Sequence, residues 1–195
     1  MHTKQRFSAI AALLIFLAGP GTCSAQQIPA QHLVVLRDSQ FITKTYIENT
    51  RSNIRYRSDT PYFYYYQETI RESYASATGL LLDGPYESFF IKDNRLHAQG
   101  MFAKGLKKGI WRYWHPNNRL QREEHWANGR LHGSFREYND DGTLLQKGRY
   151  RKGALQGCLR YYADGKPQRN ERYKNGRLLD TSQKRRFQLP FKKKQ

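Results

Sequence analysis

Three arginines recur along the chain at an interval of 24 residues, and each is followed two positions later by an aromatic residue. The arginines are Arg112, Arg136 and Arg160, and the aromatic residues are Trp114, Tyr138 and Tyr162. A guanidinium group forms paired hydrogen bonds with phosphate or carboxylate, and flat rings suit lipid, sugar or peptide. Residues i and i+2 of a strand share a face. The pattern therefore predicts a groove lined by these six side chains, which would bind an acidic partner.

A second interpretation of the same columns needs no ligand. The arginines would form a solvated face, stacked on the rings and paired with carboxylates across the strands. The carboxylates considered for this pairing are Glu124, Glu137 and Glu171. Cross-strand ion pairs are an ordinary source of sheet stability. The sequence leaves both interpretations open.

The residue types needed for catalysis do not converge in the sequence. Four histidines fall in different columns of the repeat: His97, His115, His125 and His132. The patterns HExxH and GxGxxG and a complete P-loop do not occur. Glu123 and Glu124 would point to opposite faces of a strand, which leaves no favoured pair of carboxylates. We expect no catalytic residue, no cofactor and no metal site, with a thiol nucleophile at Cys158 as the open alternative.

The first 25 residues have the pattern of a secretory signal peptide. Lys4 and Arg6 precede the apolar run "AIAALLIFLAG", and the small residues around Ala25 follow it. The apolar run is shorter than the roughly 20 residues that a spanning helix needs. We expect cleavage after Ala25, export to the periplasm or the extracellular space, and no transmembrane span in the mature chain, with a retained anchor as the alternative. Lipid attachment at Cys23 is not favoured, because the preceding "GPGT" departs from the lipoprotein pattern.

Positive charge dominates the composition. The chain carries 34 Lys and Arg against 16 Asp and Glu, a formal net charge of +18. Loss of Lys4 and Arg6 with the signal peptide would leave +16. Such a field attracts polyanions, and nucleic acid would be the expected partner in the cytoplasm. Export favours an acidic protein, an anionic lipid or an acidic envelope polymer instead.

The C-terminal segment 181–195 is basic and aromatic. Its cations are Lys184, Arg185, Arg186, Lys192, Lys193 and Lys194. Pro190 and the missing apolar period argue against a stable helix. We expect a flexible tail that binds an anionic surface weakly, at about 1 kcal/mol for each cation. A solubilising end with no binding role is the alternative.

Regularly spaced glycines reveal the repeat that carries these columns. Gly84, Gly109, Gly133 and Gly157 are followed two positions later by the large apolar residues Tyr86, Trp111, Phe135 and Leu159. A second set of turns carries Lys104-Gly105, Asn128-Gly129, Lys152-Gly153 and Asn175-Gly176. Two-residue hairpin turns need positive φ at their centre, which glycine adopts freely. We assign the second set to such turns, and the leading glycines to positions that leave room for a neighbouring aromatic residue.

The repeat predicts an all-β protein built as a single-file array of stacked antiparallel β-hairpins in an elongated, curved sheet. The array is expected over residues 60–180, including a degenerate unit made of "TPYFYYY" and "ETIRESY" and a cap from Tyr173 to Asp180. Residues 26–59 would form a partly irregular N-terminal cap, with strands in "HLVVL" and "FITKTYI", or would be partly disordered. Open sheet edges would allow oligomers.

The pattern "NGxLxGxFxxYxxxGxL" at 128–144, repeated with variations at 105–120 and 153–167, resembles the MORN repeat. It resembles more closely the bacterial MORN-variant repeat grouped under YwqK-type antitoxin proteins. The resemblance covers roughly residues 79–180 and implies stacked hairpins. This chain departs from the pattern at Asn94, Asn118 and Pro167. We expect a non-catalytic exported protein that offers an interaction surface to an acidic protein, lipid or polymer. The resemblance implies an alternative, an antitoxin-like or immunity protein that neutralises a cognate toxin.

Overall fold

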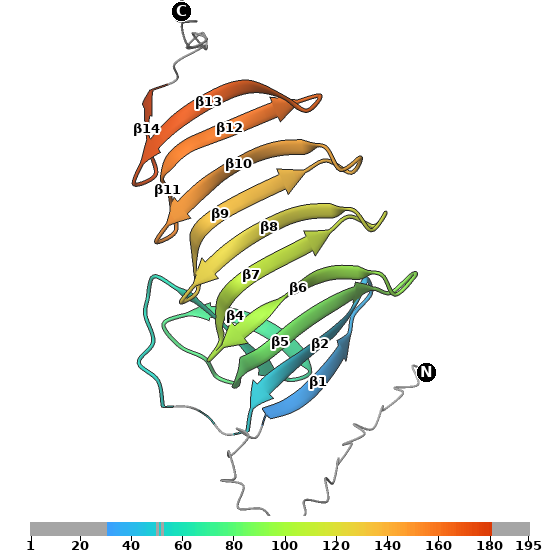
Figure 1. Cartoon of the computed structure of the whole chain (residues 1–195). Coiled ribbons are helices and arrows are strands. Elements are labelled where there is room, and N and C mark those ends of the chain that lie inside the picture. Colours follow the sequence, from blue (N-terminus) through green and yellow to red (C-terminus); the bar gives the residue numbers. More distant parts are fainter. Residues whose placement is uncertain (1–30, 50, 52, 181–195) are drawn as a thin grey trace, which may run out of the picture.

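The computed structural model describes residues 31–49, 51 and 53–180. The predicted signal peptide, the first residues of the cap and the basic tail 181–195 lie outside the described residues. Within them the protein is all-β, and fourteen strands form one open antiparallel sheet, as the repeat predicts. Figure 1 shows the hairpins following one another in single file along a curved array. No helix in the described part of the chain is long and apolar enough to cross a membrane.

The strands are β1 (Gln31–Arg37), β2 (Phe41–Glu48), β3 (Pro61–Tyr66), β4 (Thr69–Tyr74), β5 (Leu80–Phe90), β6 (Leu96–Ala103), β7 (Leu106–Trp114), β8 (Leu120–Ala127), β9 (Arg130–Tyr138), β10 (Leu144–Arg151), β11 (Ala154–Leu155), β12 (Gly157–Ala163), β13 (Lys166–Lys174) and β14 (Arg177–Asp180). Their order in the sheet is β1-β2-β5-β6-β7-β8-β9-β10-β12-β13-β14. Strand β11 lies beside β10, and the β3–β4 hairpin lies beside β5.

The two-residue turns have the geometry that their sequence predicts. Both turn residues have positive φ in each case, for example 51° and 73° at Asn128 and Gly129. The longer turns also contain one left-handed residue, and Asn94 (φ 56°) and Asn118 (φ 66°) adopt it where glycine is usual. Asparagine tolerates this conformation better than most residues. The departures from the repeat pattern therefore leave these hairpins intact.

The leading glycine of each repeat marks a β-bulge. Gly84, Gly109, Gly133 and Gly157 have φ of 129°, 72°, 123° and 83°. At Gly133, for instance, the pairs Glu124–Phe135 and Trp126–Leu131 leave three residues of β9 opposite one residue of β8. The expectation that these glycines leave room for an aromatic ring is wrong as a general rule, because a Cβ at Gly109 or Gly157 would meet no atom within 4 Å. The positive φ of the bulge is what the whole column shares.

A second bulge lies near the other end of each hairpin, where the later strand carries one extra residue. The extra residues are His97, Gln121, Leu145 and Gln168. Bulges bend a strand and increase its local twist. Two bulges in every repeat, always at the same places, give the sheet the regular curvature seen in Figure 1.

The N-terminal end differs from the predicted arrangement. Strands β1 and β2 form where "HLVVL" and "FITKTYI" predict them, but this hairpin continues the array by pairing with β5. The predicted degenerate unit does form a hairpin, β3–β4, yet it leaves the line of the array. It pairs with β5 only through Tyr64–Leu81 and Tyr65–Leu80. The sequence Pro61-Tyr62 recurs 24 residues later as Pro85-Tyr86, and this repetition correctly predicts a hairpin but not its position.

Hydrophobic burial explains where the β3–β4 hairpin goes. Alternate side chains of β3 belong to two different apolar clusters, so both of its faces must be covered. Phe63 and Tyr65 pack against the cluster of Leu82, Phe102 and Trp111 in the sheet. The backbone N–H of Phe63 donates to the carbonyl oxygen of Gly105 at 2.8 Å. The hairpin therefore covers the apolar face of the first repeats, where the main core lies.

The core face of the sheet alternates aromatic or aliphatic residues with glycine or glutamate. The directly paired residues are Tyr86–Gly100, Trp111–Glu124, Phe135–Gly148 and Leu159–Glu171. Gly100 and Gly148 provide the space for a ring that the leading glycines were expected to provide, because a Cβ at Gly100 would lie 2.3 Å from Trp111. The two glutamates of this alternation, Glu124 and Glu171, have hydrogen-bond partners. Glu171, for example, accepts hydrogen bonds of 2.9 Å from the hydroxyl groups of Tyr161 and Tyr173.

We expect Gly148→Ala to lower the free energy of unfolding by about 1–3 kcal/mol, the usual cost of overpacking. The new Cβ would lie 2.7 Å from Phe135 and 3.1 Å from Leu159. Gly157→Asn is the control, because Gly157 has a positive φ but no atom within 4 Å of a Cβ. Urea unfolding should show a change of less than about 1 kcal/mol for this variant. Equal losses in the two variants would contradict the packing role of Gly148.

Candidate functional site

The three arginines of the sequence pattern lie on the face of the sheet opposite the core. Trp111, Phe135 and Leu159 are buried on the core face, and the residue after each points the other way. Directly paired residues form a continuous line across the strands on this second face. The line, here called the charged row, consists of Lys44, Glu87, Gln99, Arg112, Glu123, Arg136, Lys147, Arg160 and Asn170.

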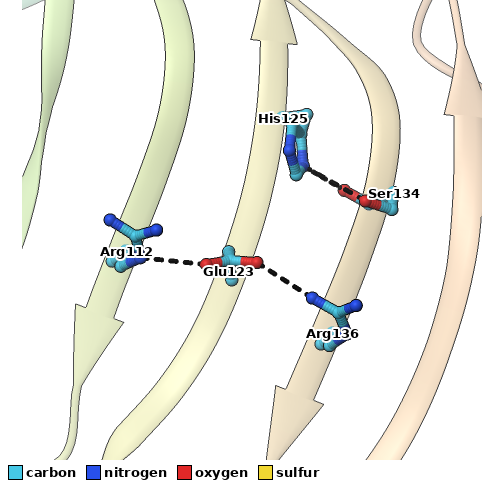
Figure 2. A network of polar contacts seen from close by, with 5 residues as sticks. All are labelled: Arg112, Glu123, His125, Ser134 and Arg136. Atoms are coloured by element: carbon cyan, nitrogen blue, oxygen red, sulfur yellow. Dashed lines mark hydrogen bonds and ion pairs between the residues drawn. The ribbon is translucent and has the colours of Figure 1, made fainter.

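Glu123 compensates the first two arginines of the row. Its carboxylate accepts from Arg112 Nε at 2.9 Å and from Arg136 Nη1 at 3.1 Å, so that it bridges β7 and β9 (Figure 2). The solvated-face interpretation named Glu124, Glu137 and Glu171 as partners, and that choice is wrong. Glu124 and Glu171 are buried on the core face, and Glu137 pairs there with Gln146. Strand alternation separates Glu123 from Glu124, as the sequence predicts.

The second half of the row is not compensated. Lys147 stands directly opposite both Arg136 and Arg160, and Arg160 stands opposite Asn170. In the described part of the chain, no carboxylate forms an ion pair with Lys147 or Arg160. Like charges placed directly opposite each other destabilise a sheet by roughly 0.2–1 kcal/mol per pair. Three adjacent cations are therefore an arrangement that folding alone does not favour.

The aromatic residues of the pattern are less closely associated with the arginines than the sequence suggests. The Lys147 ammonium lies 5.3 Å from the centre of the Tyr162 ring, which places Tyr162 on the face of the charged row. Trp114 and Tyr138 follow Arg112 and Arg136 by two positions along their strands. Tyr138, however, lines a separate hollow of about 500 Å³ with His115, at the hairpin ends. Arg136 and Arg160 share a hollow of about 250 Å³ that contains none of the three rings.

Two cations of this hollow escaped the sequence pattern. Lys147 and Arg149 come from β10, the second strand of a repeat, whereas the pattern followed only first strands. The signal was present, because Lys147 follows Gln99 and Glu123 at successive intervals of 24 residues. At this position of the repeat the residue changes from neutral Gln99 to acidic Glu123 and then to basic Lys147.

The described histidines contact different neighbours and do not form one cluster. His125 Nδ1 lies 2.8 Å from the carbonyl oxygen of Ser134, a contact that holds β8 against β9 (Figure 2). His115 Nε2 lies 3.1 Å from the carbonyl oxygen of Tyr138. His97 stacks on Phe41, and its burial lowers the pKa of the imidazole. Among the described residues, no group of three or more His, Cys, Asp and Glu is placed to hold a metal ion.

One further cation, Lys107, is enclosed by the protein's own aromatic residues. Its ammonium lies 4.3–5.6 Å from the ring centres of Phe63, Trp111, Tyr113 and Trp126. It also donates to the Tyr113 hydroxyl at 3.0 Å. Burial lowers the pKa of this amine. The contacts tie the β3–β4 hairpin to the sheet, so that Lys107 has a structural position rather than one open to a ligand.

Glu123→Gln should lower the free energy of unfolding by about 0.5–2 kcal/mol, because two partly exposed ion pairs are lost together. Glu87→Gln is the control. Glu87 lies in the same row, and its carboxylate meets the Gln99 amide at 3.4 Å. We expect a change below about 0.5 kcal/mol for that variant in urea unfolding at low salt. The difference between the two variants should shrink as salt screens the pairs, and a difference that grew with salt would contradict this account.

No family model matches the chain, and no curated protein is found to match it.

Proposed function

We propose that this protein is a non-catalytic, exported repeat protein whose charged row binds an acidic partner. The observation that carries the proposal is the run of Arg136, Lys147 and Arg160, three directly opposed cations on neighbouring strands. A purely structural face would place a carboxylate between them, as Glu123 lies between Arg112 and Arg136. An acidic ligand would supply the missing negative charge and relieve the repulsion.

Net charge supports the same conclusion over a longer range. The formal charge of +18, or +16 after loss of Lys4 and Arg6 with the signal peptide, attracts acidic macromolecules and raises the rate of encounter. The row then supplies a local site, because arginine side chains form paired hydrogen bonds with carboxylates and phosphates. We further propose that the hairpins are variants of the MORN repeat and that the partner belongs to the cell envelope. An acidic toxin is one partner of the required charge.

Binding of a defined polyanion tests the role of the row. The full chain is titrated with fluorescently labelled polyglutamate, and anisotropy is measured over a series of salt concentrations. We expect the triple variant Arg136→Gln, Lys147→Gln and Arg160→Gln to bind about tenfold or more weakly, with a smaller dependence on salt.

The matched control removes three cations that are exposed at the hairpin ends, by Lys92→Gln, Lys104→Gln and Lys166→Gln. This triple variant has the same net charge as the first. It should keep most of the affinity, and urea unfolding should show that both variants are folded. Equal weakening in the two variants would mean that net charge alone attracts the polyanion, and the row would lose its proposed role.

Export is tested by expressing the full chain in a bacterial host and sequencing the N-terminus of the product from the periplasm or the medium. We expect the chain to begin at Gln26, because the signal peptide pattern ends at Ala25. Deletion of residues 2–25 is the control and should leave the protein in the cytoplasm. Recovery of the uncleaved chain from the membrane fraction would favour a retained anchor instead.

A further inference from the structure

The hollow that Arg136 and Arg160 share is lined by four cations and no carboxylate. Its lining consists of Ser134, Phe135, Arg136, Lys147, Gly148, Arg149, Cys158 and Arg160, around a volume of about 250 Å³. Arg149, Cys158 and Arg160 are exposed. A further cation, Arg172 on the adjacent strand β13, is directly paired with Cys158.

The hollow coincides with the bulge that each repeat contains. The pairs between β10 and β12 end at Lys147–Arg160, and pairing of β10 resumes at Tyr150–Leu155. Two residues of β10 therefore lie opposite four residues that include Gly157, whose φ is 83°. Direct pairing between the strands is interrupted here. Gly148 has no side chain, so it contributes only backbone atoms to the face that carries the charged row. The concavity is thus built by the backbone of the repeat.

The equivalent positions of earlier repeats show that the fold does not require cations around this bulge. The four positions compared are those that Lys147, Arg149, Cys158 and Arg160 occupy in the hollow. Between β6 and β7 the equivalent residues are Gln99, Met101, Ile110 and Arg112. Between β8 and β9 they are occupied by Glu123, His125, Ser134 and Arg136. Between β10 and β12 they are occupied by Lys147, Arg149, Cys158 and Arg160.

The three sets of residues differ in whether their positive charges are paired with carboxylates. In the β8–β9 set, Glu123 neutralises the arginines, and His125 contacts the Ser134 carbonyl. In the β10–β12 set, no carboxylate among the described residues forms an ion pair with Lys147, Arg149 or Arg160. The backbone is thus the same in both repeats, but the side chains of the β10–β12 repeat concentrate positive charge at this bulge. Structural requirements do not explain this concentration, whereas an anionic ligand does.

We propose that this hollow binds one phosphate or sulfate group of the acidic partner. Its lining includes arginine or lysine residues from three neighbouring strands, β9, β10 and β12. A planar carboxylate is satisfied by a single arginine fork, whereas a tetrahedral oxoanion presents three or four oxygens and uses donors on several sides. The Ser134 hydroxyl can add an uncharged donor. The inference rests on the proposed function and narrows its ligand from any acidic group to an oxoanion.

Cys158 supplies the readout for a test, because its exposed thiol is part of the lining. The full chain is alkylated with iodoacetamide, an uncharged reagent, and modification is followed by mass spectrometry on the peptide that contains Cys158. Sodium sulfate is titrated against sodium acetate and sodium chloride at constant ionic strength and pH. We expect sulfate to slow the alkylation of Cys158 saturably, and acetate and chloride to have little effect.

Variants localise the effect. In the double variant Lys147→Gln and Arg149→Gln, the sulfate concentration that gives half-protection should rise about tenfold or more. Lys44→Gln, which removes one cation at the far end of the charged row, should leave that concentration within about twofold. Glu123→Gln should lower it, because the carboxylate that competes for Arg136 is gone. Urea unfolding of each variant excludes misfolding as the cause.

The inference is overturned if sulfate protects no better than chloride, or if Lys44→Gln weakens protection as much as the double variant. Polyglutamate binding separates this result from the proposed function. If polyglutamate binding still depends on the row while sulfate gives no protection, the row binds acidic partners without an oxoanion pocket. If sulfate protects Cys158 but polyglutamate binding does not depend on the row, the pocket exists and the proposed macromolecular function fails. Protection by inorganic sulfate but not by a sulfated oligosaccharide would identify a free anion as the ligand.

Discussion

The backbone register between successive hairpins is the constraint on which the rest of the structure depends. The turn glycine of each hairpin donates its N–H to a carbonyl at the start of the repeat before it, for instance Gly129 to Lys107 at 3.0 Å and Gly153 to Leu131 at 2.8 Å. A slip of one residue would turn every side chain of a strand to the other face. The bulge glycines, with their positive φ, take up the extra residues without such a slip. The core residues and the charged row therefore stay on opposite faces through every repeat.

This separation lets the two faces meet different requirements. The core face is limited by packing, since Trp111 leaves room only for glycine at position 100, and the buried Glu124 needs both Arg122 and the indole N–H of Trp126. The charged row has no such limit, and its members range from glutamate to arginine at equivalent positions. A ligand site can be assembled on the row without disturbing the core. Position 147 illustrates this freedom, because glutamate and glutamine occupy its equivalents 123 and 99.

The repeat period predicts the hairpins, their turns and the opposite placement of Arg112 and Trp111, because these follow from strand alternation and turn chemistry. The position of β3–β4 could not be predicted, since its aromatic residues fit a strand in the array as well as one above it. The role of Gly109 was misassigned, and the role of Gly148 was not predicted, for a related reason. A glycine that adopts positive φ and a glycine that makes room for a ring look the same in a sequence. Lys147 and Arg149 were missed because neighbours across strands become visible only when the second-strand columns are aligned as well.

The β3–β4 hairpin covers only one end of the array, and this asymmetry has a thermodynamic consequence. The main apolar cluster joins this hairpin to β2, β5, β6 and β7, whereas among the described residues β12 to β14 are held only by their neighbours in the sheet. In a linear array, each unit owes its stability to itself and to its nearest neighbours. We therefore expect local stability to decrease towards β14 and the array to unfold locally from that end first. The cationic hollow spans β9, β10 and β12. An anion bound there would hold these three strands together and oppose local unfolding from the β14 end. The fraction of hollows with a bound anion would then determine how many strands of the sheet stay ordered.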